Sequence, residues 1–388
     1  MRIGLTLAAW LGGLLGAPGG FAVAADFPAP LPVEPTLGVA TLATPYPRDW
    51  AFLNYLAAER IELLDTAAPA PNNVRGALGA SVVANLLQAT VRPEAYVAET
   101  FFARGTRGAR TDVITVYDQK TLASVGEVVL PGAKRGLFVI QPNAFQFTDH
   151  ERLGLVFNFT PASSVAVVDL AARRYLGEVA IPGCALIYPT GPRGFSTLCA
   201  SGTLLSVQMD ADGKVVGQSE TKPFNDIDND ALFSVPAVIS GTSYFVSFKG
   251  RVQPIDLSGA EPKLLAPWSL VTPDEAKANW RPSGWQLTAG GPDGRLYVIM
   301  RPDGHEGTHK EGGDQVWVFD VDRRVKVATI KLKSPCQSIA VSGGARPMLL
   351  ATGIGATLDR FDVATGAPAG SVPVISQGAQ TIISPVAR

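Results

Sequence analysis

The sequence His-Glu-Gly-Thr-His at positions 305–309 has the residue types and spacing of a zinc-protease motif. That chemistry needs an α-helix, because histidines four residues apart then share one face and the glutamate can act as a general base. The flanking residues include Pro302 and several glycines, which oppose a helix. The third ligand would have to be His150 or a carboxylate. We interpret the motif as a polar loop between two strands, and we expect no metal site.

Other chemical motifs are absent or incomplete. The sequence has no Gly-x-Ser-x-Gly, no phosphate-binding loop and no cysteine beside a histidine. Asp149-His150-Glu151 stands where a hairpin turn is expected, which favours a solvated turn over a catalytic group. Gly353-Ile354-Gly355 is most simply another turn. No complete active site is evident from the residue types alone.

Two segments are candidates for binding a partner. Trp280, Arg281 and Trp285 surround a Pro-Ser-Gly turn; they either fill a junction in the core or face another protein, since Trp and Arg are favoured at the centres of interfaces. A second segment carries Arg104, Arg107 and Arg110 as it enters a strand. It is either a solvated hairpin end or a docking loop whose arginines pair with carboxylates.

The elements that would position these residues repeat along the chain. Seven short apolar runs each end in an aspartate, about 50 residues apart, which is typical of a propeller with several strands per blade. Each aspartate can accept backbone N–H groups of the turn that follows it. The 40 glycines and 30 prolines suit many short strands. We predict an all-β, seven-bladed β-propeller, with a β-sandwich as the alternative; the seven residues are Asp65, Asp118, Asp169, Asp210, Asp256, Asp320 and Asp362.

The N-terminus predicts export. Arg2, a short apolar stretch and Ala22-Val23-Ala24 form a signal-peptide pattern over residues 1–24. A proline-rich extended arm is expected over 25–48 and the propeller over 49–388. No stretch is long enough to span a membrane. The net charge of −1 and the lack of a basic run exclude a nucleic-acid groove or an anionic membrane as partner.

Export permits a disulfide among the three cysteines. Cys184 and Cys199 flank a segment that reads as two strands and a turn, and a bridge there would leave Cys336 as a buried thiol. The residues alone do not fix the pairing.

Several longer segments resemble the large (heavy) subunit of the quinoprotein amine dehydrogenases, the family of the methylamine and aromatic amine dehydrogenases. The resemblance extends from about Tyr96 to the C-terminus and is carried, in the same order as in the family, by residues 99–118, 157–170, 184–199, 250–257, 280–286 and 306–310.

This resemblance implies a seven-bladed propeller, a Cys184–Cys199 disulfide and a periplasmic heterotetramer of two large and two small subunits. It implies that the small subunit supplies the tryptophan tryptophylquinone cofactor and the catalytic base, so that this chain holds no cofactor and no catalytic residue. A primary amine would be oxidised to an aldehyde and ammonia, and a copper protein such as amicyanin or azurin would accept the electrons.

The resemblance is poor before Tyr96, where the family has an aromatic residue that lines the substrate channel. Phe52 and Tyr55 are the candidates for that role. Two other functions remain open. One is a non-enzymatic periplasmic propeller that binds another protein partner, and the other is a self-contained propeller enzyme such as a lactonase-like hydrolase.

Overall fold

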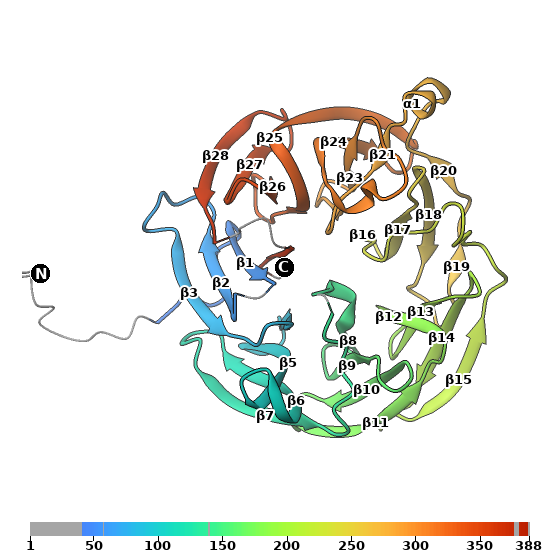
Figure 1. The fold of residues 1–388 in the computed structure, drawn as a ribbon. Helices are drawn as coiled ribbons and strands as arrows, with labels where there is room; N and C mark the ends of the chain where they lie inside the picture. The colour runs from blue at the N-terminus through green and yellow to red at the C-terminus, as the bar shows by residue number, and fades with distance from the viewer. Residues whose placement is uncertain (1–40, 57, 139, 376–379, 387–388) are drawn as a thin grey trace, which may run out of the picture. The chain divides into compact units, whose positions relative to one another are not determined.

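The computed structural model describes residues 41–56, 58–138, 140–375 and 380–386. These residues form a β-propeller, in which antiparallel sheets surround a central axis (Figure 1). Within the described residues the α-helical content is a single turn, α1 (Pro273–Lys277), which Thr272 and Glu275 cap reciprocally. No described helix is long and apolar enough to cross a membrane. The all-β prediction is confirmed.

Four of the sheets have four strands. They contain, from one edge to the other, β29 (Thr381–Pro385), β1 (Trp50–Tyr55), β2 (Arg60–Asp65) and β3 (Val74–Gly79); β4 (Asn85–Gln88), β5 (Glu94–Arg104), β6 (Arg107–Asp118) and β7 (Ser124–Leu130); β8 (Phe145–Thr148), β9 (Leu153–Asn158), β10 (Ser164–Asp169) and β11 (Arg174–Ala180); and β12 (Cys184–Pro189), β13 (Gly194–Cys199), β14 (Leu204–Met209) and β15 (Val215–Glu220).

Two sheets are larger, and two 3-10 turns lie in the connections. The five-stranded sheet contains β16 (Ala237–Ile239), β17 (Thr242–Val246), β18 (Arg251–Asp256), β19 (Lys263–Leu264) and β20 (Trp268–Ser269). The eight-stranded sheet contains β21 (Arg281–Pro282), β22 (Thr288–Gly290), β23 (Arg295–Arg301), β24 (Gly313–Asp320), β25 (Val325–Val341), β26 (Met348–Gly353), β27 (Thr357–Asp362) and β28 (Pro368–Pro373). The 3-10 turns are η1 (Pro142–Ala144) and η2 (Thr308–Lys310).

The long strand β25 explains why one sheet has eight strands. Its residues up to Lys331 pair mainly with β24, and its residues from Ser338 pair with β26. One strand therefore belongs to two neighbouring groups. The sheet count is six, so it does not by itself reproduce the predicted seven blades.

The core lies between sheets, because strands are buried on both faces. In β10, Val165 and Val167 belong to one apolar cluster, while Ala166 and Val168 belong to another. Successive side chains of a strand point to opposite faces, so each cluster is filled from two adjacent sheets. This arrangement requires apolar residues at nearly every central strand position.

The seven aspartates act as turn formers, as predicted. In the turn that follows β10, for example, Asp169 Oδ1 accepts a hydrogen bond from the backbone N–H of Ala172 at 2.8 Å. Bonds of the same kind, each to a backbone N–H two to four residues further on, are made by Asp65, Asp118, Asp210, Asp256, Asp320 and Asp362.

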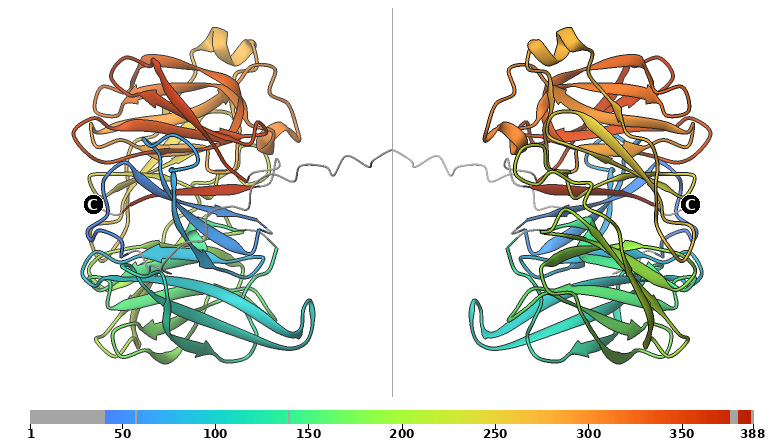
Figure 2. Two further views of the ribbon diagram at one scale, coloured as in Figure 1. Left: turned by 90° about the vertical axis from the view of Figure 1, so that its left-hand side faces the viewer. Right: turned by 90° about the vertical axis from the view of Figure 1, so that its right-hand side faces the viewer.

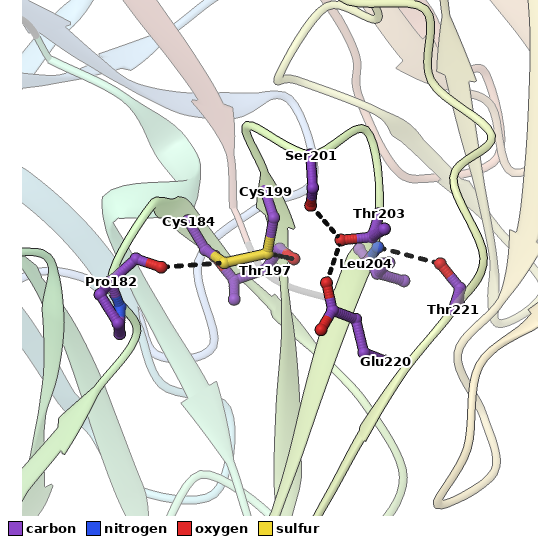
Figure 3. Close-up of a disulfide and its surroundings, with 9 residues drawn as sticks. All are labelled: Pro182, Cys184, Thr197, Cys199, Ser201, Thr203, Leu204, Glu220 and Thr221. Carbon is purple, nitrogen blue, oxygen red and sulfur yellow. Dashed lines mark hydrogen bonds between the residues drawn. A yellow bond between two sulfur atoms is a disulfide. The ribbon is translucent and has the colours of Figure 1, made fainter.

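Cys184 and Cys199 form a disulfide, with their Cα atoms 3.9 Å apart (Figure 3). They are direct partners in the pairing of β12 with β13, which places the two side chains next to each other. The pairing implied by the resemblance is confirmed. Cys336 is a buried free thiol, and burial raises the pKa of that thiol.

A buried polar network fixes the base of the β5–β6 hairpin. Arg135 is 2% exposed, and its guanidinium donates to Thr100 Oγ1 at 2.7 Å and to the carbonyl of Val83 at 3.0 Å. Its backbone N–H donates to Asp112 Oδ2 at 2.9 Å. Asp112 also accepts two bonds, of 2.9 and 3.0 Å, from Arg110. The connection that contains Arg135 is thereby locked to the hairpin.

The network shifts the titration of its members. Burial by itself raises the pKa of Asp112, but hydrogen bonds from Arg110, Thr100 and the backbone of Arg135 lower it below its ordinary value. Burial lowers the pKa of Arg135 to about 10, so it stays charged at neutral pH. Burial raises the pKa of Glu99, even though Thr115 and the backbone of Ser81 donate to it.

Replacing both cysteines of the bridge, Cys184→Ala with Cys199→Ala, should lower the free energy of unfolding by about 3 kcal/mol, because the unfolded chain regains the entropy of a loop closed across 15 residues. Urea denaturation measures the change. Dithiothreitol should bring the wild-type protein to the same stability and leave the double variant unaffected; equal stability of oxidised and reduced wild type would contradict the prediction.

Asp112→Asn should destabilise the protein at pH 7 by about 3 kcal/mol, since it removes the carboxylate that pairs with Arg110 and offsets the buried charge of Arg135. The folded pKa of Asp112 is lowered, so its stabilisation is present above the unfolded pKa, near ~3.9, and is lost as the pH falls through the folded value. The gap between wild type and variant should therefore close on acidification.

Urea denaturation between pH 7 and pH ~3 tests this dependence. Glu261→Gln is the matched control, because Glu261 is exposed and makes no ion pair among the described residues. A gap that is the same at every pH would show that Asp112 contributes only by packing.

Candidate functional site on the hairpin face

The β5–β6 hairpin projects beyond the neighbouring connections at one end of the propeller (cyan in Figure 2). Because strands alternate in direction along the chain, the connections 131–141, 159–163 and 302–312 reach the same end. We call this end the hairpin face. The aspartate turns lie at the opposite end.

Exposed aromatic side chains gather on the hairpin face. Phe101, Phe138 and Phe159 are 49%, 57% and 53% exposed, and they are the phenylalanines with the largest exposure among the described residues. The rings of Phe138 and Phe159 meet edge to face with centroids 5.2 Å apart. Exposed apolar groups gathered in this way mark interaction surfaces in soluble proteins.

The hairpin tip adds positive charge to this surface. Arg104 pairs with Arg107 across the turn, both side chains are exposed, and neither makes an ion pair within the described part of the chain. Gly105, with φ of 67°, allows the tight turn between them. Arg110 is different, because Asp112 and the carbonyl of Arg135 occupy its guanidinium. Of the three predicted docking arginines, Arg104 and Arg107 are free.

A cavity of about 360 Å³ opens near the axis on the same face. Its wall includes Phe138, Phe233, Trp285, His309 and Lys310. The ammonium of Lys310 lies 6.0 Å from the centroid of the Trp285 ring. The aromatic wall is thus already faced by a cation of the protein itself.

The His-Glu-Gly-Thr-His segment is a loop between β23 and β24, as predicted. It contains a short 3-10 turn instead of an α-helix, and the hydroxyl of Thr308 donates to the carbonyl of His305. The His309 ring packs edge-on against Phe248, with centroids 6.2 Å apart. In the part of the chain that the structure describes, no three His, Cys, Asp or Glu side chains are placed to hold a metal ion.

Asp149, His150 and Glu151 form the predicted hairpin turn at the opposite end. Asp149 pairs with Arg152 and Arg193, at 2.8 and 3.0 Å. The carboxylate of Glu151 accepts backbone N–H groups from a neighbouring loop. Both carboxylates therefore have structural partners, and only His150 is exposed.

The Trp280–Trp285 segment packs mostly inward. The Trp280 ring lies on that of Trp317 in β24, with centroids 5.0 Å apart. Trp285 is 9% exposed and its indole N–H donates to the carbonyl of Ile140 at 3.1 Å. The guanidinium of Arg281 stacks on Phe248 at 4.8 Å. These contacts leave Arg281 and the edge of Trp285 as the parts nearest to the face.

The two candidate channel aromatics are in the core. Phe52 and Tyr55 are 1% and 3% exposed, and the Tyr55 hydroxyl donates to Glu62 at 3.0 Å. Neither lines one of the larger cavities in the described structure. Their role in a substrate channel therefore stays a prediction.

Sequence reasoning missed Phe138, Phe159 and Arg135. Phe138 follows Leu137 and Phe159 follows an apolar strand, so their local sequence resembles that of core residues. The signal that could have found them is position: each falls in a connection between strands, where a large apolar side chain has fewer neighbours to cover it.

Comparison with known proteins identifies the family. The family model for the methylamine dehydrogenase heavy chain matches residues 63–385. The chain is 30% identical over 290 residues to the methylamine dehydrogenase heavy chain of Methylorubrum extorquens, covering 74% of this chain and 70% of that protein. It is 32% identical over 289 residues to that of Paracoccus versutus, covering 74% and 67%. With that of Methylobacillus flagellatus it shares 27% identity over 372 residues, 90% of each chain.

Similarity to solved structures supports the fold of this chain and nothing further. The periplasmic gluconolactonase of Pseudomonas aeruginosa aligns with a TM-score of 0.58 at 14% identity, covering 87% of this chain and 99% of that one. Dihydro-heme d1 dehydrogenase NirN aligns with a TM-score of 0.53 at 15% identity, covering 89% and 68%. The match of the family model over most of the propeller is decisive, and this chain belongs to the methylamine dehydrogenase heavy-chain family.

Proposed function

We propose that this chain is the heavy subunit of a periplasmic amine dehydrogenase, assembled with a light subunit as an α2β2 heterotetramer. The light subunit would carry tryptophan tryptophylquinone, which supplies the oxidising chemistry that converts a primary amine to an aldehyde and ammonia. A copper protein of the amicyanin or azurin type would accept the electrons. The observation that carries the proposal is the match of the heavy-chain family model to residues 63–385.

The side chains of the hairpin face support a scaffolding role for this chain. The aromatic rings of Trp285 and Phe248 already face Lys310 and Arg281. A protonated amine would be repelled by Lys310, which lines the cavity, so the cavity is a poor binding site for the substrate on its own. We assign amine binding and proton transfer to the light subunit, and to this chain the tasks of holding that subunit and excluding water around it.

We also infer seven blades, counting the eight-stranded sheet as two. The change of partner within β25, from β24 to β26, supports a blade boundary near residues 332–337. The turns at Asp320 and Asp362 then fall one in each blade, like the other five.

A periplasmic location agrees with the Cys184–Cys199 bridge, because disulfides persist in oxidising compartments. The predicted signal peptide, residues 1–24, and residues 25–40 of the predicted arm lie outside the described residues. At the end of that arm, the Leu42 N–H donates to the carbonyl of Lys120 and Tyr46 is buried against the propeller.

Affinity purification of this chain from its native periplasm tests the proposal. We expect a smaller subunit to co-purify in equal amounts, with a quinone absorbance in the visible spectrum and amine-dependent reduction of a redox dye. Methylamine is the first substrate to assay, and the intact mass of the small subunit should show both the loss of hydrogen that accompanies a tryptophan cross-link and the gain of oxygen that accompanies the quinone. A colourless single chain without amine activity would refute the proposal and favour the non-enzymatic propeller.

A further inference from the structure

We propose that one surface of the hairpin face binds the second subunit, and that the second subunit contributes an apolar patch bordered by carboxylates. We name this surface of the hairpin face the Phe–Arg surface, and its residues are Phe101, Arg104, Arg107, Phe138 and Phe159. This inference rests on the proposed function, since it assigns the surface at which the proposed heavy and light subunits meet.

The apolar half of the argument comes from exposure. About half of the surface of each of these three residues is open to solvent, whereas the other described phenylalanines are less exposed. Phenylalanine contributes a large apolar area and loses little side-chain freedom when a partner covers it. Phe138 and Phe159 already support each other edge to face, so a partner would meet a preformed pair.

The charged half of the argument comes from a comparison between arginines that have a carboxylate partner and arginines that have none. Arg75, Arg110 and Arg152, for example, each have a carboxylate within hydrogen-bonding distance. Arg104 and Arg107 have none among the described residues. A guanidinium binds a carboxylate through two parallel hydrogen bonds, and this geometry makes free arginines beside aromatic rings effective anchors for an acidic surface.

The surface is also rigid, which lowers the entropy cost of binding. The Arg110–Asp112 pair and the buried Arg135 fix the base of the hairpin. The same connection reaches the aromatic pair, because the Phe159 N–H donates to the carbonyl of Lys134 at 2.8 Å. Hairpin and rings are therefore held in one arrangement before a partner arrives.

Other occupants fit this surface less well. In a symmetric dimer of this chain, each copy would have to supply carboxylates opposite the arginines of the other copy, and the Phe–Arg surface contains none. An anionic membrane is attracted by clusters of four or more basic residues, and the hairpin tip offers two. A second subunit with carboxylates around an apolar centre satisfies both features.

The test uses the complex from the native periplasm, with a tag on this chain. Arg104→Glu with Arg107→Glu, and separately Phe138→Ser with Phe159→Ser, should each lower the ratio of the quinone-bearing subunit to this chain at least about tenfold. That ratio is measured by native mass spectrometry after purification in about 0.15 M salt. Raising the salt should weaken the wild-type complex, because exposed ion pairs are screened.

Matched controls lie on outer strands. Arg174 is an exposed, unpaired arginine of β11, and Val216 of β15 is 65% exposed. Arg174→Glu and Val216→Ser should retain the subunit ratio of the wild type, and circular dichroism confirms that each variant is folded.

The outcomes separate the two proposals. If the wild-type chain recovers the quinone-bearing subunit and the double variants recover it equally well, the Phe–Arg surface is not the interface, while the proposed function stands. The same holds if the control variants lose the subunit too, or if the double variants change only self-association or vesicle binding. If the wild-type chain recovers no such subunit, the proposed function fails and this inference fails with it.

Discussion

Burial of each sheet on both of its faces is the constraint on which the rest of the structure depends. Because the two sides of β10 fill different apolar clusters, a sheet without neighbours would expose a full face of valine and alanine. The sheets must therefore close around an axis. Closure is made by β29, which pairs with β1 although the two strands are separated by nearly the whole chain. Strands from the beginning and from the end of the propeller's sequence are thus needed to complete the ring of sheets.

This constraint leaves function to the connections. Strand positions are committed to the core, whereas loops can carry side chains that nothing in the chain covers. At one end of the propeller lie the aspartate turns, in which each carboxylate accepts backbone N–H groups of its own turn. At the other end the connections carry Phe138 and Phe159, and the β5–β6 hairpin projects. The two ends therefore differ in kind: one is closed by local hydrogen bonds, and the other presents unpaired apolar and cationic groups.

The features that could be predicted from sequence are local ones. An aspartate at the end of an apolar run needs only its own turn, so all seven assignments agree with the structure. The buried polar network at the base of the β5–β6 hairpin could not be predicted, because Asp112 and Arg135 are brought together only by the path of the chain from one sheet to the next. The number of sheets differs from the predicted number of blades, since β25 pairs with β24 over one part of its length and with β26 over another. Local spacing can mislead as well: residues 305–309 have metalloprotease spacing without the helix that gives the spacing meaning.

Membership of the heavy-chain family gives these features a common physical explanation. On the proposed function this chain would hold no redox group, and it would need a rigid frame and one surface that recognises the proposed light subunit. The buried Arg135 network costs desolvation free energy that an apolar replacement would avoid. It does, however, fix the direction in which the hairpin tip presents Arg104 and Arg107. Ions buried at such a cost, at the base of the hairpin that carries Arg104 and Arg107, fit the proposed need to orient that surface better than the stability of the fold alone.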